Sequence, residues 1–140
     1  MPTTIQANQI QNLQQIEAAV AGPDGANRLI IITGHIIINL TAFTPVTVRN
    51  EAFSALIGPG LTRQQFIRAI AIASVSTVSL SLGSLSTYGW AISGVDADRD
   101  DESGQVELRF ELSASVTGQN STVAVNEVDF QVTILAAVAT

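Results

Sequence analysis

A strict alternation of apolar and polar side chains across residues 105–116 constrains the fold more than any other feature of the chain. A β-strand places successive side chains on opposite faces of its sheet, so this period of two predicts a long strand with one buried and one solvated face. Such strands are typical of antiparallel sheets, which commonly cover a core on one side only. The apolar positions are Val106, Leu108, Phe110, Leu112, Ala114 and Val116.

Further segments alternate with the same period. Residues 78–82 and 87–92 are predicted strands that precede the long one. Gly118-Gln119-Asn120 predicts a hairpin turn, after which residues 123–134 form the return strand. The alternation in that return strand slips by one position at Asn126-Glu127, which predicts a β-bulge.

Residues 29–40 contain two nearly continuous apolar runs, rich in β-branched residues, on either side of Thr33-Gly34-His35. Apolar runs without alternation predict strands that are buried on both faces. We expect them in the middle of a sandwich or against a neighbouring subunit. A short strand is also expected at residues 46–48.

Residues 4–20 have a helical period instead. Their apolar side chains recur every three or four positions, which predicts an N-terminal helix that Gly22-Pro23 ends. The polar face is almost entirely Gln and Asn, with Glu17 as its only charge, so we expect this helix to pack against protein. The apolar residues of the pattern are Ile10, Leu13, Ile16 and Val20.

Two short internal helices are also predicted. Residues 50–57 have the pattern of a helical turn, which Gly58-Pro59-Gly60 ends. Thr62 and Gln65 match a capping box, so the second helix is expected over residues 62–72, with continuation as a strand as the alternative for its second half.

These elements predict a mainly β fold: an antiparallel β-sandwich of jelly-roll-like character, with an N-terminal helix and one or two short internal helices. Residues 1–22 are assigned to the N-terminal helical segment and residues 23–140 to a single β-sandwich domain. The length of 140 residues is usual for one domain and long enough for a core without disulfides, and the chain has no cysteine.

The composition favours a subunit that associates with copies of itself. Only 13% of the residues are charged, compared with about 25% in ordinary soluble domains, and 46% are hydrophobic. All six basic residues are arginine, so lysine, the usual protector of strand edges, is absent. We therefore expect homo-oligomers in which apolar surface and strand edges are buried between subunits. A compact monomer with many uncharged polar side chains is the alternative.

Charge and segment lengths also bear on partners. The net charge of -6 argues against nucleic acid, which requires a basic surface. The longest apolar run, residues 29–40, is shorter than the roughly 20 residues of a spanning helix, and the N-terminus lacks the pattern of a signal peptide. We expect a soluble protein without membrane insertion, or a mature chain that has already been trimmed. It is expected in the extracellular space or as part of a particle or filament.

One stretch has the spacing of a calcium site. Asp96, Asp98, Asp100 and Glu107 occupy the first, third, fifth and twelfth positions of the calcium-loop pattern, and hard cations prefer such oxygen ligands. The sixth position is Asp101 where that pattern has glycine, and the flanks are predicted strands. The alternative is a solvated acidic loop that an arginine partly balances.

No complete catalytic set is found in the sequence. His35 is the only histidine, so a multi-histidine zinc site is excluded, and no nucleophile elbow motif is present. We interpret His35 as a hydrogen-bonded turn or interface residue, and Glu107 and Glu111 as part of a wet sheet face that also resembles a glycosidase carboxylate pair. Tyr88 and Trp90 are predicted core residues, with a sugar-stacking surface as the alternative.

The sequence thus predicts a protein that is not an enzyme. The leading hypothesis is a structural, self-assembling subunit of a fibre, shell, capsid or appendage, with the N-terminal segment in its interfaces. The alternative is a β-sandwich binding module for calcium or carbohydrate that uses the acidic loop 96–107. No cofactor is expected other than the calcium of that alternative.

Overall fold

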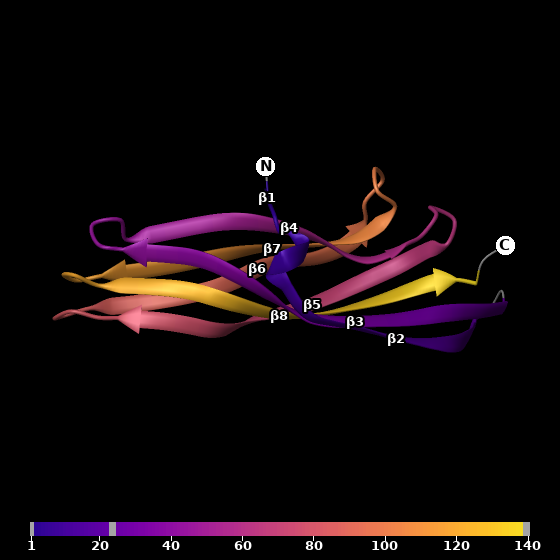
Figure 1. Cartoon of the computed structure of the whole chain (residues 1–140), viewed down its shortest axis with the longest axis horizontal. Helices are drawn as coiled ribbons and strands as arrows, with labels where there is room; N and C mark the ends of the chain where they lie inside the picture. The colour runs from indigo at the N-terminus through magenta and orange to yellow at the C-terminus, as the bar shows by residue number, and fades with distance from the viewer. Residues whose placement is uncertain (1, 23–24, 139–140) are drawn as a thin grey trace.

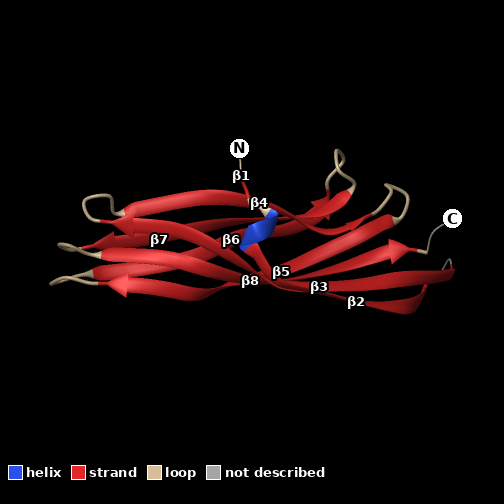
Figure 2. Cartoon of the chain, viewed as in Figure 1, coloured by secondary structure: helices blue, strands red, loops and turns tan. Residues whose placement is uncertain are grey.

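A computed structural model describes residues 2–22 and 25–138, which form two four-stranded sheets with strands along the long axis of the molecule (Figure 1). The described residues contain no α-helix, and their one helical element is the short 3-10 turn η1 (Figure 2). The mainly β prediction is confirmed. The elements are β1 (Thr3–Thr4), η1 (Ala7–Gln9), β2 (Ile10–Gly22), β3 (Gly25–Phe43), β4 (Val48–Gly60), β5 (Phe66–Ser81), β6 (Thr87–Arg99), β7 (Gln105–Thr117) and β8 (Thr122–Ala137).

Strand pairing defines the two sheets. Sheet A has the order β1-β4-β7-β6, and sheet B has the order β2-β3-β8-β5. Every pairing is antiparallel except that of β1 with β4, which is parallel. Strands β2 and β5 are the two edges of sheet B. None of the described helical residues forms a segment long and apolar enough to cross a membrane.

The alternating segment 105–116 lies in β7, as predicted, in the middle of sheet A. Its apolar side chains are at most 2% exposed, and the ring of Phe110 stacks on that of Phe53 from β4 with 5.5 Å between centroids. The buried face of sheet B, which includes Ile32 of β3 and Val132 of β8, belongs to the same core. The two sheets therefore bury one shared set of apolar side chains between them.

The apolar runs of residues 29–40 lie in one continuous strand, β3. Within the single chain only one face of this strand is buried, so burial on both faces in the middle of a sandwich is wrong, and burial against a neighbouring subunit stays a prediction. Alternate residues such as Ile30 and Ile32 are buried in the core, whereas Ile31 on the opposite face is only half-buried. Because this second face is apolar as well, the sequence hides the alternation. We call it the outer face of sheet B.

The predicted N-terminal helix over residues 4–20 is wrong. Residues 10–22 form β2, which pairs with β3 from Gln14↔Thr33 to Gly22↔Gly25. A register shift between Gln11 and Gln14 changes the phase of the strand, so a spacing of three between Ile10, Leu13 and Ile16 is compatible with a bulged strand. Pairing with β3 outweighs the weak local preference of this Gln- and Asn-rich segment.

The internal helices are wrong as well. Residues 50–57 belong to β4, and residues 66–72 to β5. The capping box itself is present: the Thr62 amide donates to Gln65 Oε1 (2.9 Å), and the Gln65 amide donates to Thr62 Oγ1 (3.1 Å). These hydrogen bonds close the turn between β4 and β5 and do not start a helix.

Two local predictions in β8 are confirmed. Gly118-Gln119-Asn120 joins β7 to β8, and Gly118 (φ +110°) and Asn120 (φ +50°) have the left-handed backbone of a tight connection. The register changes between Val125, which lies opposite Leu40, and Glu127, which lies opposite Ile37. This is the bulge that the slipped alternation predicts, and it places Glu127 on the outer face of sheet B.

Candidate functional site

The predicted calcium ligands are divided between two strands and a turn of sheet A. Asp96 and Asp98 lie in β6, where Asp96 is opposite Arg109 and Asp98 is opposite Glu107 in β7. Arg109 also hydrogen-bonds Glu107. Two of the acidic residues therefore have a cation beside them.

The remaining predicted ligand, Asp100, begins the turn between β6 and β7. Its Oδ2 accepts hydrogen bonds from the amide (3.0 Å) and hydroxyl (2.7 Å) of Ser103, which lower the pKa of Asp100 below its usual range. Arg63 and Arg99 form ion pairs with the neighbouring Asp101, at 2.9 and 3.1 Å. The turn is thus held by internal hydrogen bonds and arginines, as in the alternative of a solvated acidic loop.

Within the described residues, no three of the four predicted ligands, Asp96, Asp98, Asp100 and Glu107, form a group that could surround one ion. The calcium site stays a prediction. A rise in melting temperature with millimolar calcium, lost in Asp98→Ala, would support it, and an unchanged melting temperature would refute it.

A different cluster lies in the centre of the outer face of sheet B. His35 of β3 is directly opposite Asp129 of β8, and Glu127 is two residues before Asp129 on the same face. His35 Nδ1 contacts Asp129 Oδ1 and lies 3.4 Å from Glu127 Oε1. One ligand atom from each of the three side chains lies within 4.8 Å of the others, which makes this the only such group among the residues described. We call it the His-Glu-Asp cluster.

His35 interacts electrostatically with both Asp129 and Glu127. The hydrogen bond to Asp129 raises the pKa of His35 above its ordinary value of 6.5, and the charges of Asp129 and Glu127 act in the same direction. The side chain of Thr77, on β5, donates to Glu127 Oε2 at 3.1 Å and leaves Oε1 facing His35. All three cluster side chains are only partly buried, so water and solutes can reach them.

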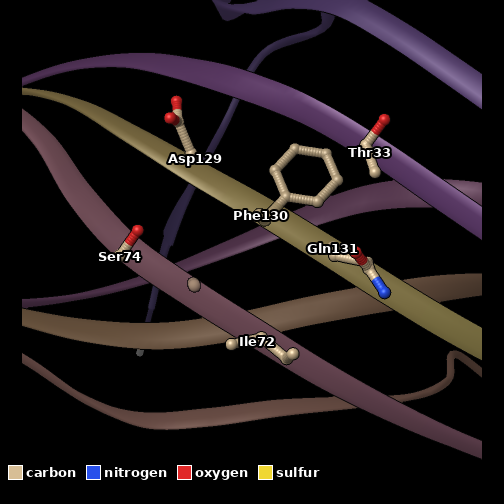
Figure 3. A pocket seen from close by; sticks show the side chains of 7 residues that line it. Thr33, Ile72, Ser74, Asp129, Phe130 and Gln131 are labelled. Carbon is tan, nitrogen blue, oxygen red and sulfur yellow. The ribbon is translucent and has the colours of Figure 1, made fainter.

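Shallow hollows flank the cluster on both sides. One, of about 350 Å³, lies toward β2 and is lined by Asn12 and Gln14 together with His35 and Asp129. The other, of about 250 Å³, lies toward β5 and is lined in part by Asp129 and Ser74. Figure 3 shows Asp129 on β8 and Ser74 on the adjacent strand β5. The hollows are open and small, so they suit an ion or a small solute better than a large ligand.

Next to the cluster, the outer face of sheet B becomes apolar. Ile16, Ile31, Thr133 and Ile70 are opposite one another in register, so one row crosses all four strands. Ile16 is 67% exposed, Ile70 is 53% exposed, and Ile72 in the adjoining row is 66% exposed. We call this surface the outer apolar patch. Its members are Ile16, Leu29, Ile31, Ile70, Ile72 and Leu135.

Tyr88 and Trp90 are not core residues, so that prediction is wrong. They are 48% and 43% exposed, and their rings stack nearly parallel with centroids 6.1 Å apart. They lie on β6, which is an edge strand of sheet A. Among the described residues, no further strand pairs with the outer edge of β6. Their alternation is correct for a strand, but an edge position leaves half of each ring in solvent.

No family model, curated protein or solved structure matches this chain. The site is therefore characterised by its own residues. The sequence does not predict Asp129 and Glu127 as ion ligands, because only the pairing of β8 with β3 brings them to His35. The available signal is the pair of acidic residues at positions 127 and 129, the only charges in that strand.

Proposed function

We propose that the protein is a structural subunit that self-associates through the outer apolar patch of sheet B and through the open edges of that sheet, β2 and β5. The observation that carries this proposal is the outer apolar patch, which presents well-exposed isoleucines from edge strands on opposite sides of one sheet. Large apolar patches on a soluble protein are typical of interaction surfaces. The occupant that we propose for this one is a second copy of the chain.

Open strand edges support the same partner. Strands β2 and β5, of 13 and 16 residues, each pair on one side only among the described residues. Long unprotected edges readily pair with another chain, and proteins that avoid this place lysine or proline there. Neither strand contains a lysine or a proline. Pairing between copies would satisfy these backbone groups.

The accessible surface of the single chain is also large for its mass. It measures 8011 Å² for 14.7 kDa, whereas a folded monomer of that mass exposes about 6,900 Å². The excess of about 1,100 Å² exceeds the ~800 Å² that each partner buries in a standard protein interface. A second copy on sheet B would bring the exposed surface down to the usual range.

The scaffold that we propose for this role is a β-sandwich of jelly-roll-like character. The chain passes between sheets A and B at five connections, which are β1–β2, β3–β4, β4–β5, β5–β6 and β7–β8. Two sheets that are linked in this way form a stiff body, and the outer face of sheet B can then serve as an interface between copies. The role is structural, with no catalytic residues assigned.

Sedimentation velocity at micromolar concentration tests the proposal. The native chain should sediment as a species larger than 14.7 kDa. Ile72→Arg should weaken association by at least about 100-fold, because it removes about 1–2 kcal/mol of apolar burial from each copy and buries an unpaired charge. Ala91→Arg, an exposed outward position on sheet A, is the matched control and should associate as the native chain does. A native monomer, or an Ile72→Arg oligomer of native affinity, would refute the proposal.

The alternative function, a carbohydrate-binding module, is favoured by one observation. The stacked and half-exposed rings of Tyr88 and Trp90 form a flat aromatic surface of the kind on which sugar rings pack. Titration of Trp90 fluorescence with soluble oligosaccharides tests it. Saturable quenching that Tyr88→Ala abolishes would support this function, and an unchanged spectrum would exclude it.

A further inference from the structure

We propose that the His-Glu-Asp cluster, His35, Glu127 and Asp129, is a binding site for a divalent transition metal ion of the Zn²⁺ class. This inference does not depend on self-association. It rests on the geometry of the three side chains, on the charge around them and on the residue that orients one of them.

The geometry suits a small ion. A metal bound at about 2.0–2.1 Å to nitrogen and oxygen in a tetrahedral arrangement has ligand atoms roughly 3.3 Å apart. His35 Nδ1 and Glu127 Oε1 are 3.4 Å apart, and all three ligand atoms fit within 4.8 Å. His35 Nδ1 and Asp129 Oδ1 are already in contact, so an ion bound between them would replace the hydrogen bond that joins them.

The two neighbouring carboxylates of Glu127 and Asp129 favour the binding of a cation. Glu127 and Asp129 project from the same face of one strand, and closely spaced carboxylates repel each other unless a positive charge lies between them. Within the described part of the chain, no arginine forms an ion pair with either residue. Arg68, also on the outer face, is opposite Leu135, about 20 Å along β8 from Asp129. Among the described residues, His35 is the one basic side chain that pairs with the two carboxylates.

The residues around the cluster orient its side chains as the neighbours of metal ligands usually do. Thr77 holds the second oxygen of Glu127 at 3.1 Å, so that the first is directed at His35, and such outer hydrogen bonds orient ligands in metal sites. Asp129 borders both hollows, which leaves room for water in the remaining coordination positions. Three protein ligands with open positions are the arrangement of reactive zinc sites, whereas structural zinc sites are closed by four.

The ligand types select the class of metal. Calcium and magnesium prefer six or more oxygen ligands, and a site with one imidazole and two carboxylates supplies too few. Imidazole favours zinc, copper, nickel and iron, and carboxylates are compatible with the same ions. Zn²⁺ is therefore the probe of choice, with Co²⁺ as its spectroscopic substitute.

Isothermal titration of the chelator-treated full chain with ZnCl₂ tests the site. The native protein should bind one equivalent, His35→Ala and Asp129→Asn should each weaken binding at least about 100-fold, and Thr77→Val should weaken it about 10–100-fold. Glu111→Gln removes an exposed carboxylate from sheet A and, as the control, should bind as the native protein does. Bound Co²⁺ should give visible absorption bands that change in His35→Ala.

The outcomes that overturn the proposal are equally specific. Absence of a stoichiometric zinc isotherm in the native protein would do so, as would native affinity in His35→Ala. Calcium binding as tight as that of zinc would show that the imidazole is not a ligand. All three cluster residues lie on a face outside the core, so circular dichroism should show native folding in each variant.

Discussion

Replacing Gly58 by alanine should destabilise the protein, whereas the same change at Gly60, two residues further along β4, should not. A Cβ atom at position 58 would lie 2.5 Å from Cβ of Val106 and 3.0 Å from its Cγ2. At Gly60 no atom lies within 4 Å of the added carbon. Val106 is fully buried in β7, and its Cβ is fixed to the backbone, so it cannot rotate away.

The expected difference can be worked out from these contacts. Extra volume in a packed core costs about 1–3 kcal/mol. At Gly60, where the backbone is outside the left-handed region, alanine should stabilise the fold by about 0.4–1 kcal/mol by restricting the unfolded chain. The two variants should therefore differ by about 1.4–4 kcal/mol in free energy of unfolding, or roughly 5–15 °C in melting temperature.

Urea and thermal unfolding, followed by circular dichroism at one protein concentration, would measure this difference. The double variant Gly58→Ala/Val106→Gly supplies the control, because removing the whole Val106 side chain takes away the contacts at 2.5 and 3.0 Å. The cost of Gly58→Ala should then fall by at least about 1 kcal/mol in a double-mutant cycle. If Gly58→Ala were as stable as Gly60→Ala, the close packing of β4 on β7 would be refuted.

Three further predictions concern the core, a turn and the histidine. Leu112→Ala should cost about 2–5 kcal/mol in urea unfolding, because Leu112 is fully buried, and a cost below 1 kcal/mol would contradict the shared core. Thr62→Ala should cost about 1 kcal/mol by the same assay, because it removes the acceptor of the Gln65 amide, whereas Thr62→Ser should be neutral. In metal-free protein, stability from the His35–Asp129 hydrogen bond should be complete below pH 6.5 and lost as the pH rises through the raised His35 pKa. Asp129→Asn should remove this dependence, and an unchanged profile would argue against the contact.

The sequence predicts the fold best where one face of a strand is polar. In β7, the polar members of the alternation are half-buried or exposed and the apolar ones are buried, so the period of two is visible. In β3 the outer face is also apolar, and Ile31 and Ile32 look alike in the sequence although only Ile32 is in the core. We propose that the outer face of sheet B is buried between copies. Because this face is apolar, the alternation of β3 cannot be seen in the sequence.

Local sequence signals predict the wrong element where strand pairing with a distant segment decides the structure. The Thr62–Gln65 capping box forms as expected, yet its hydrogen bonds close a turn because the next segment pairs with β8. The helical spacing at the N-terminus is equally compatible with a bulged strand, and pairing with β3 stabilises the strand. Both segments depend on partners far away in the chain, which neither propensity nor spacing encodes.

The His-Glu-Asp cluster could not be predicted for the same reason. His35 is 92 positions from Glu127 and 94 positions from Asp129 in the chain. These residues meet only through the register of β3 with β8. The stretch from Asp96 to Glu107 predicts an ion site from the sequence because its carboxylates are close together in the chain. In the fold, part of that stretch is strand, and three of its carboxylates, Asp96, Asp101 and Glu107, lie beside arginines.

Hydrogen–deuterium exchange of the β2 amides, compared between dilute and concentrated protein, tests the central proposal of self-association most directly. In a single chain the outward amides of this edge strand have no partner strand among the described residues, so they should exchange quickly. At concentrations where the protein associates, they should become protected together with those of β5, while the outward edge of β6 stays unchanged. Equal and rapid exchange of β2 and β5 at all concentrations would contradict the proposal.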